Sequence, residues 1–122
     1  MSLRAAALAA TLGVGTGGAT ATLIPRGDGL DAYRETAALA LEVGLTPEQA
    51  VVATAIATGE SNHRDEARGD TTITDGTWGP SLGRWQVRCF WDQIGTGRTR
   101  DCDRLGDPHF NARSMFEISG GG

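Results

Sequence analysis

Residues 46–63 read TPEQAVVATAIATGESNH and contain the clearest helix signal in the chain. Thr46 at the cap position, a proline at the first helical position and Gln49 at the third form a capping box, which satisfies the first backbone amides of a helix. Apolar residues then recur at helical spacing. The stretch predicts a helix over residues 47–59, which the Ser-Asn-His sequence at its end interrupts.

Two further helices are predicted on either side of this stretch. Residues 31–43 contain only helix-tolerant residues between Asp31, which can cap the start, and Gly44, which can end the helix. Asp107 followed by Pro108 repeats the cap-then-proline pattern and predicts a last helix.

The polar, glycine-rich middle of the chain predicts β-structure. Residues 71–74 (Thr-Thr-Ile-Thr) favour a strand, and the Asp75-Gly76 dipeptide after them is a hairpin turn signal. Residues 86–93 are predicted to form a short helix. The expected fold class is α+β and mostly α, a helical domain with a small β-hairpin.

Length and composition indicate one globular domain behind a leader. The chain has 122 residues, 39% of them hydrophobic and 21% charged, which suits one small domain. Because the composition changes after Pro25, we expect the leader over residues 1–27 and the domain over residues 28–122. The net charge of −4 and the lack of a basic tract argue against nucleic acid as a partner.

The leader leaves two interpretations open. Residues 5–24 are uncharged and long enough for a membrane span, but glycines and threonines make them too polar for a stable one. Arg4, the apolar run behind it and the small residues Ala19-Thr20-Ala21 are weak elements of a signal peptide. The alternative is an Ala/Gly-rich leader on a chain that stays in the cytosol.

The expected state of the two cysteines depends on whether the chain is exported. Cys89 and Cys102 have 12 residues between them and could close a loop. In an exported protein a disulfide is expected, whereas inside a cell or a virion two free thiols are expected. Neither cysteine has a second cysteine or a histidine at the spacing of metal ligands, so no metal site is predicted.

Glu60 is the first candidate for catalysis. It continues the helix face formed by Val52, Ala55 and Ile56, so we expect its carboxylate to lose hydration, which raises the pKa of a carboxyl group. A carboxyl group that is protonated near neutral pH can act as a general acid. The alternative is a glutamate at a helix end that turns to solvent.

Three segments carry a resemblance to a known family: residues 57–62 (ATGESN), residues 83–87 (GRWQV) and residues 107–112 (DPHFNA). In this order they resemble the helix ending in Glu-Ser, the Gly-x-x-Gln segment and the Pro-x-x-Asn helix start of soluble lytic transglycosylases and goose-type lysozymes. The resemblance covers about residues 47–118 and implies a lysozyme-like fold.

The resemblance also implies a role for each matching residue. Glu60 would be the catalytic acid/base, and Ser61 would orient its carboxyl group. Gly83 and Gln86 would line the sugar-binding cleft, and Asn111 would tie its helix to the cleft wall and so contribute to substrate binding. One glutamate suffices in this family, because the substrate's N-acetyl group or 6-hydroxyl completes the reaction.

Aromatic and acidic residues near these segments are further candidates. Sugar rings stack on aromatic faces, so Trp78 and Trp85 are expected to bind substrate, whereas Trp91 is expected in the core. A lone histidine, His63, is expected to be solvated, and no metal or cofactor is predicted. Four acidic residues could supply a second carboxylate but are expected on a solvated loop: Asp65, Glu66, Asp70 and Asp75.

The end of the chain departs from the family pattern. The family usually has a cleft tyrosine after the asparagine helix, whereas the only tyrosine here is Tyr33 and the sequence ends at Gly122. We therefore expect a domain that is incomplete at its C-terminus, with a cleft open on that side.

Together these features predict an enzyme that cleaves the β-1,4 bond between N-acetylmuramic acid and N-acetylglucosamine in peptidoglycan. The alternative is a non-catalytic wall-binding or phage virion structural module on the same fold. The expected partners are peptidoglycan glycan strands and other virion or cell-wall proteins. The expected location is secreted or virion-associated.

Overall fold

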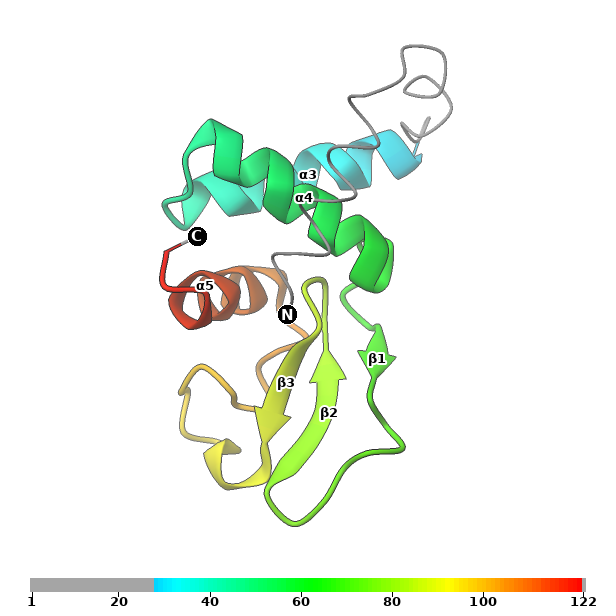
Figure 1. Ribbon diagram of the computed structural model, residues 1–122, viewed down its shortest axis with the longest axis vertical. Coiled ribbons are helices and arrows are strands. Elements are labelled where there is room, and N and C mark those ends of the chain that lie inside the picture. The colour runs from blue at the N-terminus through cyan, green and yellow to red at the C-terminus, as the bar shows by residue number, and fades with distance from the viewer. Residues whose placement is uncertain (1–27, 122) are drawn as a thin grey trace.

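The computed structural model describes residues 28–121, and the leader expected over residues 1–27 lies outside the described residues. Three helices and a small antiparallel sheet make up the described part, which confirms the mostly helical α+β class. Figure 1 shows α3 and α4 side by side, α5 beneath them and the sheet in the lower half. The elements in chain order are α3 (Asp28–Glu42), α4 (Pro47–Ser61), β1 (Arg68–Gly69), β2 (Trp78–Leu82), β3 (Val87–Phe90), a 3-10 turn (Trp91–Gln93) and α5 (Pro108–Ile118).

The first two helices form a hairpin that the local signals predict well. α3 begins at Asp28, so Asp31 lies inside the helix and not at its cap. Gly44 lies in the turn between α3 and α4 and has φ +116°, a backbone conformation that residues with a side chain rarely adopt. The capping box is confirmed: Thr46 Oγ1 accepts from the Gln49 backbone N–H at 3.2 Å, and Gln49 Oε1 accepts from the Thr46 N–H at 3.0 Å.

The sheet differs from the expected hairpin. Residues 71–74 form no strand, and the three strands pair antiparallel in the order β1-β2-β3. The Asp75 carboxylate accepts from the backbone N–H groups of Thr77 and Trp78 at 2.8 and 2.7 Å, so the Asp75-Gly76 turn leads into β2. The connection between β2 and β3 is instead the four-residue segment 83–86.

The prediction of a helix over residues 86–93 is also wrong, because these residues form β3 and the 3-10 turn. Val87 and Cys89 are buried while Arg88 and Phe90 are half-buried. This alternation is the two-residue period of a strand with one covered face. Pairing with β2 therefore overrides the weak helix pattern.

The core lies between the helices and the β2–β3 connection. Trp85 is fully buried, and its indole Nε1 donates to the Ala53 carbonyl of α4 at 2.7 Å. α5 begins as predicted, with the Asp107 carboxylate accepting from the Phe110 N–H at 3.0 Å. Met115 brings α5 into the same core.

Candidate active site

The connection between β2 and β3, residues 83–86, joins the three segments that carry the family resemblance. The hydroxyl of Ser61, the last residue of α4, donates to the Arg84 carbonyl at 2.6 Å. The backbone N–H of Trp85 donates to Oδ1 of Asn111, in the first turns of α5, at 2.9 Å. The end of α4 and the start of α5 are therefore both attached to this turn.

Asn111 connects α5 to the turn at residues 83–86 through hydrogen bonds from its side chain. Its Nδ2 donates to the carbonyls of Leu82 and Leu105, each at 2.9 Å, and the side chain is fully buried. Gly83 packs against it with φ +78°, and a Cβ at Gly83 would lie 2.5 Å from the Leu105 carbonyl oxygen. Asn111 and Gly83 thus shape the turn from inside, and buried Asn111 offers no surface for a direct substrate contact.

Glu60 lies in the last turn of α4 with its side chain exposed. The expectation that apolar neighbours desolvate it is therefore wrong. Residues 58–60 are all exposed, because the last turn of α4 extends past the core and only Ser61 returns to it. The carboxylate of Glu60 faces water beside the point where the helix meets the turn.

Ser61 is placed differently from its expected role. Its hydroxyl lies 2.6 Å from the Arg84 carbonyl and 3.2 Å from the Ala57 carbonyl, so it binds backbone and does not orient Glu60. Asn62 then ends the helix in the left-handed conformation, with φ 52°.

Arg84 is buried at the centre of a polar cluster that sequence reasoning missed. Its guanidinium pairs with both oxygens of Asp65, at 3.0 and 2.9 Å, and also donates to Glu35 at 3.1 Å and Thr36 at 3.0 Å. Burial alone lowers the pKa of Arg84, but Asp65 and Glu35 outweigh it and raise this pKa above its ordinary value. Asp65 is therefore half-buried in an ion pair and does not lie on a solvated loop.

His63 belongs to the same cluster and is buried, which corrects the expectation of a solvated histidine. Its Nδ1 lies 2.8 Å from Thr36 Oγ1, and its Nε2 lies 2.8 Å from Thr58 Oγ1. Burial, reinforced by the charge of Arg84, lowers the pKa of His63. Thr36 also donates to the Ala32 carbonyl. Thr58 Oγ1 likewise lies 3.1 Å from the Thr54 carbonyl, so each threonine hydroxyl has both the ring and a backbone carbonyl as hydrogen-bond partners.

Gln86 closes the turn with its own side chain. It adopts φ 51°, is buried, and donates through Nε2 to the carbonyls of Ala67 at 3.0 Å and Gly83 at 2.9 Å. A Cβ at Gly69 would collide with Gln86 Oε1, so glycine is needed where β1 passes the amide. Among the described residues, no hydrogen-bond donor contacts this Oε1, which packs against Gly69.

The predictions for Trp85 and Trp91 are both wrong, because Trp85 lies in the core and Trp91 lies at the surface. Trp85 has no exposed surface, so the interpretation that it stacks on sugar is wrong. Trp91, which was expected in the core, is 38% exposed, and its Nε1 donates to the Asp75 carbonyl at 2.7 Å. The exposed indole surface therefore belongs to Trp91, whose backbone N–H donates to the Thr77 carbonyl at the end of the sheet away from the turn.

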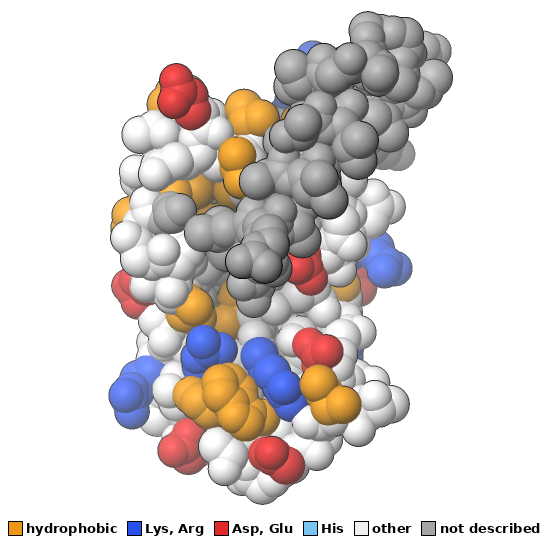
Figure 2. All heavy atoms as spheres, viewed as in Figure 1, with side chains coloured by type: hydrophobic (Ala, Val, Ile, Leu, Met, Phe, Trp, Pro, Cys, Tyr) orange, Lys and Arg blue, Asp and Glu red, His pale blue; other side chains and the backbone are white. Residues whose placement is uncertain are grey.

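Trp78 lies at the far end of β2, about 13 Å along the strand from Leu82. Its ring is half-buried and lies 3.9 Å from the ring of Phe90, between centroids. Arg88 and Arg100 lie over the Trp78 ring at 5.4 and 5.1 Å. Figure 2 shows the corresponding pattern, a hydrophobic patch flanked by arginines over the lower part of the sheet. Trp78 is thus not brought together with Glu60.

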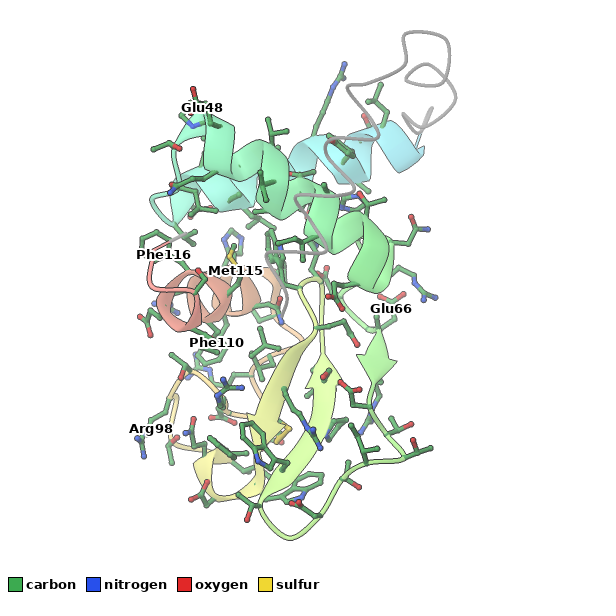
Figure 3. All side chains as sticks on the ribbon, viewed as in Figure 1. Glu48, Glu66, Arg98, Phe110, Met115 and Phe116 are labelled. Atoms are coloured by element: carbon green, nitrogen blue, oxygen red, sulfur yellow. A yellow bond between two sulfur atoms is a disulfide. The ribbon has the colours of Figure 1, made fainter. Side chains whose placement is uncertain are left out.

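A groove of about 350 Å³ lies along β2, between the segment that leads into β1 and the loop after β3, and combines acidic and apolar side chains. Figure 3 places one of them, Glu66, just beyond the end of α4. Such a mixture of apolar surface with a few polar groups is typical of small-molecule sites. The lining includes Asp65, Glu66, Pro80, Leu82, Trp91 and Asp103.

The carboxylates of Asp70 and Asp75, the other candidates, have hydrogen-bond partners of their own and do not contact Glu60. Asp70 accepts from the Ser81 hydroxyl, and Asp75 is exposed and holds the turn before β2. Backbone hydrogen bonds from Trp78 and Thr77 lower the pKa of Asp75. Within residues 28–121, no three metal-binding side chains lie close enough to hold an ion.

The two cysteines form a disulfide between β3 and the following loop. The Cα atoms of Cys89 and Cys102 lie 5.1 Å apart, so the expected proximity is confirmed. Across the described part of the chain, no helix has the length and apolarity to cross a bilayer.

A helical domain with a small sheet, whose central turn joins the end of one helix to the start of another, is the arrangement expected of a lysozyme-like protein. A family model described as a lysozyme-like domain matches residues 37–122, and the chain belongs to this family. Neither the curated proteins nor the solved structures gave a match, so the family model carries the comparison.

Proposed function

We propose that the chain cleaves the β-1,4 bond between N-acetylmuramic acid and N-acetylglucosamine in peptidoglycan, with Glu60 as general acid and base. Membership of the lysozyme-like family supports this substrate class. The strongest structural support is the hydrogen bond from Ser61 to Arg84, because it attaches the residue after Glu60 to the turn at residues 83–86.

The reaction needs a proton on the leaving glycosidic oxygen and stabilisation of an oxocarbenium-like centre. Protonated Glu60 donates the proton, and its carboxylate then accepts one from water or from the substrate's 6-hydroxyl. The N-acetyl group of the substrate stabilises the sugar cation. Glu60 is exposed in the free chain, so a bound glycan strand would exclude water from it.

The substrate contacts follow from the groove and its exposed indole. Trp91 would stack on a sugar ring in the groove that it lines, whereas the buried side chain of Gln86 would shape the turn from inside. Trp85 and Asn111 support the turn from the core side. Trp78 would contact only a strand long enough to reach the far end of β2.

The disulfide supports a secreted location, because such bonds persist in oxidising compartments. A non-catalytic wall-binding or virion structural module remains the second candidate. One observation favours it: among the described residues, no hydrogen bond orients the exposed carboxylate of Glu60, and the neighbouring Ser61 hydroxyl binds only backbone carbonyls.

The test compares Glu60→Gln with Glu48→Gln, since both residues are exposed glutamates of α4. Figure 3 places Glu48 at the opposite, N-terminal end of the helix. Purified peptidoglycan is incubated with each protein, and released fragments are identified by mass spectrometry, which separates hydrolysed from anhydro ends. We expect Glu60→Gln to lose at least about 100-fold in release, to keep its melting temperature and to sediment with peptidoglycan.

Glu48→Gln should release fragments like the unmodified chain. Near-normal release by Glu60→Gln would refute the assignment of Glu60. An unmodified chain that sediments with peptidoglycan but releases no fragments would refute the enzyme and favour the binding module.

A further inference from the structure

A second hollow lies away from Glu60, between α5 and the loop that carries the second cysteine. It has a volume of about 400 Å³. Three arginines line it, Arg98 and Arg104 from the loop and Arg113 from α5. Figure 3 shows Phe110 on the side of α5 that faces the loop with Arg98. We call this hollow the arginine pocket.

The arginine pocket has an excess of positive charge. Glu117 is the only acidic residue in its lining. The ion pairs within residues 28–121 involve Arg84 and His109, and none involves the three pocket arginines. Residues 1–27 contain no Asp or Glu. Within residues 28–121, no carboxylate therefore forms an ion pair with any of these three guanidinium groups.

Two of the arginines share one aromatic ring. The Arg104 and Arg113 guanidinium carbons lie 5.3 and 5.7 Å from the centroid of the Phe110 ring. The ring attracts each cation, but it also holds two like charges near each other. An anion bound between them would remove this repulsion.

The wall that carries Arg98 is held in place before any ligand binds. The buried Asp101 carboxylate accepts from the backbone N–H groups of Gly97 at 2.9 Å and Asp103 at 3.0 Å. Burial raises the pKa of Asp101, but these backbone bonds and the charge of Arg104 outweigh it and lower the pKa overall. Asp101 is therefore occupied by the loop, and the disulfide at Cys102 attaches the same loop to β3.

We propose that the arginine pocket binds a phosphate group of the monoester or inorganic type. A guanidinium forms paired hydrogen bonds with oxyanions. A phosphate monoester carries a charge near −2 and three acceptor oxygens, which suits three arginines opposed by one glutamate. A carboxylate offers only two oxygens and one charge. The site is independent of Glu60 and of glycan cleavage.

The test is calorimetric titration at constant ionic strength with inorganic phosphate, glycerol 1-phosphate, a glycerol phosphodiester polymer and acetate as four separate probes. We expect binding of phosphate and the monoester, and at least tenfold weaker binding of acetate. Comparison of the monoester with the polymer distinguishes a free phosphate from a polymer-borne one. Tighter binding of the polymer, or of acetate, than of both small phosphates would overturn the assignment to a monoester.

Four variants locate the site. Arg113→Gln should weaken phosphate binding about tenfold, and Glu117→Gln should strengthen it, a gain that unfolding cannot produce. The exposed Arg34 of α3 provides the matched control, because Arg34→Gln removes an equal charge elsewhere. Glu60→Gln should bind phosphate unchanged, so a failed cleavage assay does not affect this result. Equal weakening by Arg34→Gln and Arg113→Gln, or no phosphate binding at millimolar concentration, would overturn the proposal.

Discussion

The side chain of Asn111 holds the backbone N–H of Trp85 at 2.9 Å, and this bond joins α5 to the turn between β2 and β3. The same amide satisfies two further carbonyls, those of Leu82 and Leu105. One buried side chain therefore supplies hydrogen-bond partners to three backbone groups around the turn.

Asn111→Ala should lower the free energy of unfolding by about 3 kcal/mol, because it leaves buried backbone groups without partners. Urea unfolding measures the change. Thr72→Ala is the control, since Thr72 is exposed and has no hydrogen bond within the described residues; it should change stability by less than about 0.5 kcal/mol. A similar small change in Asn111→Ala would show that the tie is dispensable.

Gly83→Ala should destabilise the protein by at least about 2 kcal/mol, because the residue has φ +78° and a Cβ would strike the Leu105 carbonyl. Gly59→Ala provides the opposite case. Gly59 lies in α4 with nothing within 4 Å of its would-be Cβ, so alanine should stabilise the helix by about 0.5–1 kcal/mol. Thermal unfolding of the two variants should shift in opposite directions, and shifts of the same sign would contradict this account.

Stability should fall as the pH drops from 7 to 5, because the folded state lowers the pKa of His63 below its ordinary value of 6.5. The unfolded chain then binds a proton that the folded chain does not, so protonation favours unfolding. His63→Gln should remove this pH-dependent loss, while His109→Gln should keep it. Urea unfolding at several pH values provides the measurement, and an unchanged slope in His63→Gln would exclude the histidine as its source.

Reduction of the Cys89–Cys102 disulfide should cost about 3 kcal/mol of stability through the entropy of the freed loop. Guanidinium unfolding with and without a reductant measures the loss. The double variant Cys89→Ser with Cys102→Ser should have the same free energy of unfolding as the reduced protein, and the reductant should not change it. If reductant leaves the unmodified protein's stability unchanged, the bridge does not contribute to it.

Local signals predicted the helices because their evidence lies within a few residues. The capping box of Thr46 and Gln49 and the cap at Asp107 needed no distant partner. The hairpin was misplaced for the opposite reason: Gln86 adopts φ 51° only because its own amide binds the carbonyls of Ala67 and Gly83. No pattern of neighbouring residues in the sequence predicts such a turn.

The candidate site divides in the same way. The resemblance implied that Asn111 ties its helix to the wall that Gly83 lines, and Asn111 packs against Gly83 and accepts from the Trp85 N–H. It also implied that Ser61 orients Glu60, whereas the Ser61 hydroxyl binds the Arg84 carbonyl. The cluster around Arg84 could not be predicted, because its partners Glu35 and Asp65 lie 49 and 19 positions away. Charge in the sequence indicates that pairs will form but not which residues pair.

The four residues of the turn at 83–86 have one consequence for how the molecule can move. Arg84 holds α3 through Glu35 and Thr36, Trp85 holds α4 through Ala53, and Gln86 holds the segment before β1 through Ala67. Rotation of the sheet against the helices would break all of these bonds together, so the turn cannot serve as a hinge. A ligand therefore meets a preformed rigid surface, and adaptation to it is left to exposed side chains such as Glu60.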